Sequence, residues 1–194
     1  MAGLAATSFY WQGCAEGDAI AADRPLRELL RSGETVAMGI ALDQIQRSWA
    51  LSRFGGDVPY EDFEQEVLEC ARTLLRQPPT PAELSPYTGE GANHASALNA
   101  MMNIARAEDC GLIADVLERT SNPNVREAVA SAAGAALSCC DDESAGCGRL
   151  VGLIGTFADD PRLPVLERAR LLGALDRAPG ATATALRDRG ARFL

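Results

Sequence analysis

One segment in the C-terminal half of the chain concentrates residues that could do chemistry. Residues 137–147 read LSCCDDESAGC and contain Cys139, Cys140 and Cys147 beside three consecutive acids. Such a segment could hold a metal ion, form a disulfide or turn between two helices. Zinc ligands usually come as cysteine pairs separated by two to four residues, because this spacing lets two thiolates converge on one ion. Adjacent cysteines on a helix point in different directions, and no second pair has the zinc spacing.

The acids of this segment also do not match a known cation motif. Asp141, Asp142 and Glu143 are consecutive, whereas the oxygen ligands of a calcium loop alternate along the chain. The favoured interpretation is structural. Cys140 continues the apolar face of the preceding helix as a small hydrophobic residue, and the acids begin the next helix, where negative charge suits the helix dipole. A metal site and a thiol switch or disulfide stay open as alternatives.

His94 is the single histidine, so every mechanism that needs an imidazole must use it. One histidine excludes metal sites with several histidine ligands. Cys110 is the thiol nearest to His94 in sequence, but no pattern brings the two together. We interpret His94, within GANHASALNAMM, as a capping or surface residue at a helix start. An acid–base role in a small-molecule enzyme is the alternative.

A third group of residues is acidic. The segment 57–69 has no basic residue, and its carboxylates are candidate partner-binding residues: Asp57, Glu61, Asp62, Glu64, Glu66 and Glu69. Acid–base catalysis by two of them would need a pocket that separates their pKa values, and the sequence indicates none. Most of them fall opposite Phe63, Val67 and Leu74, which is typical of a solvated helix face. The functional alternative is recognition of a basic partner, because like charges on one helix destabilise it until a partner neutralises them.

Composition and charge restrict the class of protein. The chain has 194 residues, of which 47% are hydrophobic and 23% charged, as in a folded single domain. Its net charge of −9 argues against nucleic-acid binding, and all 18 basic residues are arginine. No signal peptide and no apolar run of about 18 residues are recognisable. We therefore predict a cytoplasmic protein without a cofactor, whose six cysteines are thiols.

Apolar residues recur at helical spacing along most of the chain. The predicted helices cover 24–31, 34–52, 60–76, 94–107, 109–119, 124–138, 148–158, 164–177 and 181–189. A segment with four prolines, 76–91, interrupts this pattern and predicts a long loop. No useful segment alternates with a period of two, so the predicted fold class is all-α.

The predicted helices form pairs. Four amphipathic helices rich in small residues are each followed by a second apolar helix: TVAMGIALDQI (35–45), ASALNAMMNIA (95–105), VREAVASAAGAAL (125–137) and VLERARLLGALDRA (165–178). Their spacing is one repeat per 31–39 residues, which is typical of a helical hairpin. A unit of this size buries its apolar face only by stacking on its neighbours.

Two of these segments carry a family resemblance. NPNVREAVASAAGAAL (122–137) and DPRLPVLERARLLGAL (160–175) resemble HEAT-type α-helical repeats, in which an Asp/Asn-Pro turn precedes a helix with Val, Arg and Ala at these offsets. The resemblance implies a right-handed superhelix of about four helical hairpins, a HEAT-like α-solenoid. It implies a single domain over 1–194, with irregular helices over 20–76, a proline-rich loop over 77–92 and regular hairpins over 93–190. It specifies an architecture and not a function.

These features together predict a non-enzymatic protein-binding module. Small size, an acidic surface and the lack of a catalytic constellation favour an inhibitor or immunity-type protein that neutralises a basic partner protein. A scaffolding subunit of a larger assembly is one alternative, and a small-molecule enzyme or lyase that uses His94 is another. No catalytic, cofactor-binding or metal-binding residue is predicted, and neither a membrane nor a nucleic acid is the expected partner.

Overall fold

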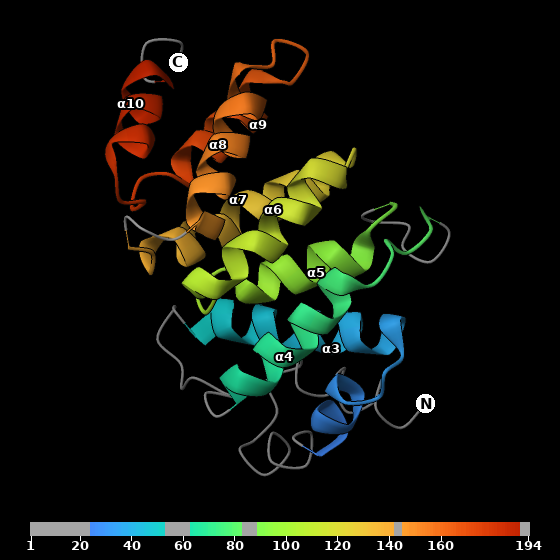
Figure 1. Cartoon of the computed structure of the whole chain (residues 1–194). Coiled ribbons are helices and arrows are strands. Elements are labelled where there is room, and N and C mark those ends of the chain that lie inside the picture. The colour runs from blue at the N-terminus through green and yellow to red at the C-terminus, as the bar shows by residue number, and fades with distance from the viewer. Residues whose placement is uncertain (1–23, 53–62, 83–88, 142–144, 191–194) are drawn as a thin grey trace.

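The computed structural model describes residues 24–52, 63–82, 89–141 and 145–190, and within these ranges its regular elements are helices without any strand (Figure 1). The all-α prediction is therefore confirmed. A first helix covers 24–30. The following helices are α3 (Thr35–Ser52), α4 (Glu64–Arg76), α5 (Ala92–Met101), the 3-10 helix η3 (Ala107–Asp109), α6 (Cys110–Arg119), α7 (Pro123–Ser138), α8 (Ala145–Asp159), α9 (Val165–Gly173) and α10 (Ala181–Gly190).

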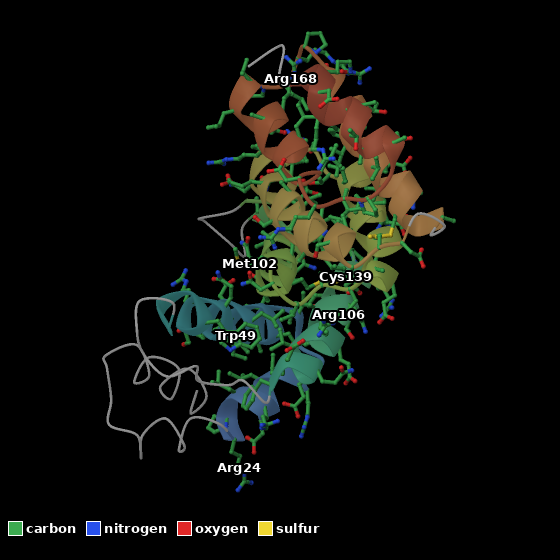
Figure 2. The ribbon with its side chains drawn as sticks, turned by 90° about the vertical axis from the view of Figure 1, so that its left-hand side faces the viewer. Arg24, Trp49, Met102, Arg106, Cys139 and Arg168 are labelled. Atoms are coloured by element: carbon green, nitrogen blue, oxygen red, sulfur yellow. A yellow bond between two sulfur atoms is a disulfide. The ribbon has the colours of Figure 1, made fainter. Side chains whose placement is uncertain are left out.

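The helices stack in two rows. In the first row α3 packs against α5, α5 against α7 and α7 against α9. In the second row α4 contacts α6, α6 contacts α8 and α8 contacts α10. The rows join because α4 packs against α5, α6 against α7 and α8 against α9. Arg24 and Arg168 mark the two ends of the stack in Figure 2.

Neighbouring helices of the first row run in the same direction. Residues near their N-termini face each other in three pairs: Gly39 and Ser96, Gly91 and Val125, and Arg126 and Glu167. The N-terminal ends of α3, α5, α7 and α9 consequently lie along one side of the stack, which we call the first-row edge.

Small residues let the rows pack closely. Helix α7 lies between α5 and α9 and buries alanine on most of its circumference: Ala128, Ala130, Ala132, Ala133 and Ala136. Larger aliphatic side chains such as Leu42, Leu117 and Leu137 are fully buried between the helices. Burial of each leucine stabilises the fold by roughly 1.5–3 kcal/mol. The apolar periodicity of the sequence therefore corresponds to one continuous core.

The helix bounds agree with the sequence prediction except at a few ends. The helix predicted over 94–107 ends at Met101, because a new turn begins where Asp109 accepts a hydrogen bond from the Arg106 backbone N–H (2.8 Å) and starts η3. Helix α9 ends at Gly173 rather than at 177, and the chain continues as tight turns. Residues 60–62 of the helix predicted over 60–76 lie outside the described ranges. Among the helices of the described ranges, none is both long and apolar enough to cross a bilayer.

Candidate functional site

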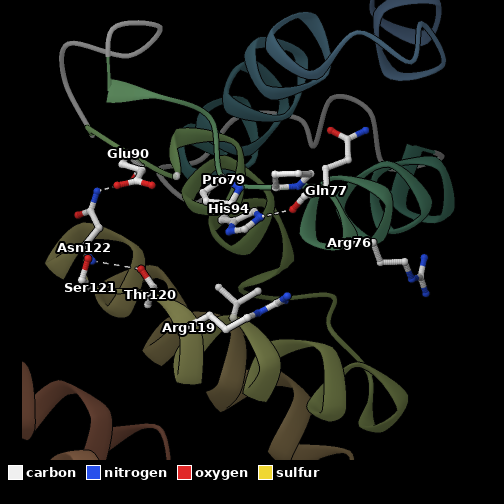
Figure 3. A pocket seen from close by; sticks show the side chains of 12 residues that line it. Arg76, Gln77, Pro79, Glu90, His94, Arg119, Thr120, Ser121 and Asn122 are labelled. Atoms are coloured by element: carbon white, nitrogen blue, oxygen red, sulfur yellow. Dashed lines mark hydrogen bonds between the residues drawn. The ribbon is translucent and has the colours of Figure 1, made fainter.

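A cavity of about 370 Å³ opens on the first-row edge, between the α4–α5 and α6–α7 pairs (Figure 3). The end of α4, the segment 77–79, the start of α5, the end of α6 and the residues before α7 form its walls. Its polar lining includes Arg76, Gln77, His94, Arg119 and Asn122, with Glu90 at one side. The cavity brings together residues that are up to 46 positions apart in the chain (76 to 122).

Hydrogen bonds to Asn93 hold the proline-rich segment against α5. The Asn93 carboxamide oxygen accepts from the Thr80 backbone N–H (2.9 Å), and its amide donates to the Pro78 carbonyl (3.0 Å). The Gly91 N–H donates to the Thr80 carbonyl (2.8 Å), at a φ of 86° that favours glycine. Prolines lack a backbone N–H and cannot donate regular helical hydrogen bonds. These side-chain and backbone contacts hold the segment in place instead. The loop predicted over 77–92 is thus fixed at 77–80, while 83–88 lie outside the described residues.

The same segment covers His94. The ring Nε2 lies 2.9 Å from the Gln77 carbonyl oxygen, and only 6% of the residue is exposed. The prediction of a capping or surface histidine is therefore wrong, because residues 77–80 fold across the start of α5. Burial lowers the pKa of His94, the Gln77 carbonyl partly opposes this shift, and the positive charge of Arg119 adds to it.

The neutral ring gives the cavity one directional acceptor. A carbonyl can only accept, so Nε2 carries the proton and Nδ1 keeps its lone pair. Within the described residues, Nδ1 has no hydrogen-bond partner, and it is not an enclosed atom. It therefore faces the cavity, on the side of the ring away from Gln77 (Figure 3). In this position it can accept a hydrogen bond or a proton from a bound molecule.

Two arginines supply positive charge to the cavity. Arg119 uses its Nε to bind the Asp115 carbonyl (2.9 Å), which leaves its terminal amino groups for other contacts. Neither Arg119 nor Arg76 forms an ion pair with a carboxylate of the described ranges, although Glu90 lines the same cavity. Most other described arginines are ion-paired: Arg24, Arg27, Arg31, Arg72, Arg106, Arg126, Arg149, Arg162, Arg170 and Arg189. The cavity can thus accommodate a small anion.

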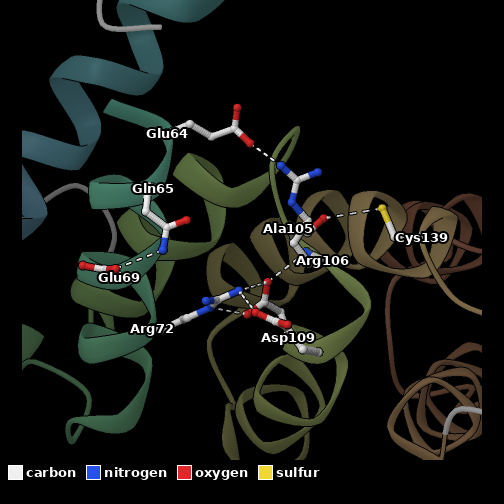
Figure 4. Close-up of polar contacts among 9 residues, drawn as sticks. Glu64, Gln65, Glu69, Arg72, Ala105, Arg106, Asp109 and Cys139 are labelled. Atoms are coloured by element: carbon white, nitrogen blue, oxygen red, sulfur yellow. Dashed lines mark hydrogen bonds and ion pairs between the residues drawn. The ribbon is translucent and has the colours of Figure 1, made fainter. Parts of the chain in front are cut away.

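The candidate acids of α4 lie in a charged network beside α6 (Figure 4). Glu64 pairs with Arg106, and Glu69 accepts a hydrogen bond from the Gln65 amide (2.9 Å). Glu66 lies deeper, with 20% of its side chain exposed, and pairs with both Arg27 and Arg31. The structure therefore places Glu64 and Glu69 toward solvent and engages Glu66 inside the fold. Asp57, Glu61 and Asp62 lie outside the described residues, and partner binding by the six acids stays a prediction.

Arg72 organises the centre of this network. Its Nε donates to Asp109 (2.6 Å) and its terminal amino group to Glu108 (2.6 Å). Asp109 is 2% exposed at its side chain, whereas the Glu108 side chain is 70% exposed. The pKa of Arg72 is raised chiefly by its hydrogen bond to Asp109. One guanidinium therefore neutralises a buried acid and holds an exposed one at the surface.

The cysteine segment is not a simple turn. Cys140 and Cys147 form a disulfide, so the prediction of six thiols is wrong for these two. Cys110, the first residue of α6, places its sulfur 3.5 Å from each of the two disulfide sulfurs. Burial, followed by the nearby Asp109 and Cys139, raises the pKa of the Cys110 thiol to about 12. Cys139 is exposed, in agreement with the expectation that adjacent cysteines diverge.

Several residues of these sites were not singled out from the sequence, among them Arg72, Asp109 and Asn93. Arg76, Gln77 and Arg119 belong to segments whose pattern indicated only helix ends or a loop. Cys110 was noted only as the thiol nearest to His94. None of these residues has a local signal, because each acquires its neighbours only through tertiary packing.

Neither a protein-family model nor a curated protein nor a solved structure matches this chain.

Proposed function

We propose that this protein is a non-enzymatic protein-binding module, built as a HEAT-like right-handed superhelix of about four helical hairpins. The parallel stacking of helices in the first row supports the repeat architecture, since equivalent helices of successive hairpins run in the same direction in such folds. The binding surface is the acidic face formed by α4 and by Glu108 of η3. Its partner is a protein with a basic surface. Within this class, we propose that the chain is an inhibitor or immunity-type protein that neutralises this partner.

The proposal rests on one observation: Arg72 is far less exposed to solvent than its ion-pair partner Glu108. Arg72 is 18% exposed at its side chain, whereas its partner Glu108 is 70% exposed. Nearby, Glu64 is 42% exposed, and Glu69 is exposed without an arginine partner in the described ranges. Arg106, the partner of Glu64, is itself 53% exposed. The unbalanced negative charge of this face therefore comes from Glu108, which lies above the 18% exposed Arg72, and from Glu69. A preformed acidic face accelerates association with a basic protein and makes it sensitive to salt.

Affinity capture from the source organism at low and at raised salt tests the proposal. We expect the wild type to retain a basic protein at low salt and to release it as salt rises. The triple change Glu64→Gln, Glu69→Gln and Glu108→Gln should abolish retention. The matched control Asp115→Asn with Glu118→Gln removes exposed acids of α6 elsewhere and should retain the partner. Retention by the triple variant, or capture that is insensitive to salt, contradicts the proposal.

The cavity favours a second candidate function, the binding of a small organic anion. Arg76 and Arg119 would pair with a carboxylate or phosphate of the ligand, and Nδ1 of His94 would accept a hydrogen bond or proton from it. Such a site is also the starting point for an enzyme that uses His94 in acid–base chemistry. Thermal shift with a panel of small carboxylates and phosphates tests this candidate. Stabilisation should disappear in Arg119→Gln and persist in Arg177→Gln, an exposed arginine that does not line the cavity. Equal stabilisation of both variants contradicts it.

A further inference from the structure

Three sulfur atoms converge where α6, α7 and α8 meet. Cys110 begins α6, Cys140 follows α7, and Cys147 is the third residue of α8. Their sulfurs all lie within 4.8 Å of one another, and Cys110 and Cys147 are buried. In the structure one pair of these sulfurs, Cys140 and Cys147, is a disulfide. Three cysteines from three helices thus share a space that a single ion could occupy.

The surroundings of these sulfurs suit a cation held by thiolates. Each of the two buried cysteines lies in the first turn of a helix, whose positive end partly offsets the burial that disfavours a thiolate, and a bound cation would supply the remaining stabilisation. The start of α8 packs against the start of α6, since a side-chain carbon at Gly146 would make ordinary contacts with the Gly111 nitrogen (3.5 Å) and with Cys110 Cβ (3.8 Å). Among the described residues, this is the one group of three or more His, Cys, Asp or Glu side chains that could converge on a metal ion.

We propose that Cys110, Cys140 and Cys147 form a three-thiolate site for a divalent cation of the zinc class, which becomes available when the Cys140–Cys147 disulfide is reduced. Thiolate ligands select zinc over the hard cations magnesium and calcium, which prefer oxygen. The sulfur of Cys139 lies 3.9 Å from the Ala105 carbonyl oxygen and is exposed, so it is not one of the ligands. A water molecule completes the tetrahedral geometry that zinc prefers.

Loading of the site needs a reductant and releases protons. A dithiol reductant transfers two electrons and two protons to the disulfide, which yields the thiols of Cys140 and Cys147 and oxidises the reductant to its own disulfide. Binding of one divalent cation then displaces one proton from each of the three thiols. The resulting complex carries a single negative charge, which the two helix N-termini partly offset.

Titration of the reduced, desalted full chain with Co²⁺ under anaerobic conditions tests this proposal. We expect a thiolate-to-cobalt charge-transfer band that saturates at one equivalent and is bleached by Zn²⁺. The air-oxidised chain, in which the disulfide is intact, should give no band. Absence of the band in the reduced chain overturns the proposal.

Variants assign the ligands. Cys110→Ser should abolish the band, whereas Cys70→Ser, a buried thiol of α4 outside the cluster, and Cys139→Ser should keep it. A band that persists in Cys110→Ser, or that disappears in Cys139→Ser, overturns the ligand assignment. Circular dichroism of each variant identifies any loss of the fold.

X-ray absorption at the zinc edge identifies the ligands in the zinc-loaded wild type. This measurement needs no variant, so it does not depend on whether a variant folds. We expect three sulfur neighbours at about 2.3 Å. A first shell made only of nitrogen and oxygen overturns the proposal.

Discussion

The His94 cavity and the Arg72 network are both rich in arginine, yet they use it in opposite ways. In the network, Arg72 neutralises Asp109, a carboxylate that is 2% exposed. In the cavity, Arg76 and Arg119 form no ion pair with an acid of the described ranges. An arginine in the sequence can therefore bind a ligand only where the fold does not already pair it with an acid. Arginine stabilises the fold where a buried acid faces it and remains available for a ligand where none does.

The largest effect is expected at the centre of the network. Arg72→Met leaves the Asp109 carboxylate buried without its counter-ion, which should lower the free energy of unfolding by about 3 kcal/mol. Urea denaturation measures this change. Arg149→Met is the matched control, because Arg149 pairs with two acids at the surface, and its effect should be much smaller. Equal losses in the two variants would remove the distinction between buried and exposed pairs.

The segment that covers the cavity should be the next most sensitive feature. Asn93→Ala leaves the buried Thr80 N–H without its acceptor, at a cost of about 2 kcal/mol in the free energy of unfolding. Asn99→Ala, a partly buried asparagine in the same helix, controls for the change of residue and should cost less. Urea denaturation again compares the two. A neutral Asn93→Ala would mean that the prolines alone hold the segment in place.

The pH dependence of stability sharpens the assignment of His94. Its pKa is lowered from the usual 6.5, chiefly by burial, so the folded protein binds this proton less readily than the unfolded chain does. Above the unfolded pKa the group contributes nothing to the pH dependence. As pH falls below about 6.5 the unfolded chain takes up the proton first, and stability decreases until the folded pKa is passed. Denaturation of the wild type and of His94→Gln between pH 8 and pH 5 measures this difference. A parallel pH dependence in both proteins would contradict a buried neutral imidazole.

The smallest effect on stability is expected on the outer face of α4. Glu69→Gln removes an exposed carboxylate whose side-chain partner among the described residues is Gln65, so the free energy of unfolding should change by less than about 0.5 kcal/mol. The same change should nevertheless slow association with a basic partner at low salt, which stopped-flow kinetics measures. A stability loss comparable to that of Arg72→Met would show that Glu69 belongs to the network rather than to the binding face.

Local sequence signals predicted α7 accurately. Asn122 caps this helix by accepting from the Asn124 N–H (2.9 Å), and Pro123 occupies its first position, as the Asn-Pro turn indicated. The end of α5 was missed because its periodicity continues past Met101 while the Arg106–Asp109 cap interrupts the helix. Helix ends depend on capping contacts as well as on apolar spacing, and those contacts are weakly encoded by residue type.

The sequence by itself determined the helices and the apolar face that each must bury, since these follow from periodicity within a single segment. Which helices pack together was decided by the tertiary structure, in which α4 packs against α5, α6 against α7 and α8 against α9. It also restricted imidazole chemistry to His94. Only the tertiary structure decided that residues 77–80 cover this histidine, that Arg72 meets Asp109, and that Cys110 meets Cys140 and Cys147. Each of these contacts joins residues 17 to 37 positions apart, and the stacking of helix pairs brings them together.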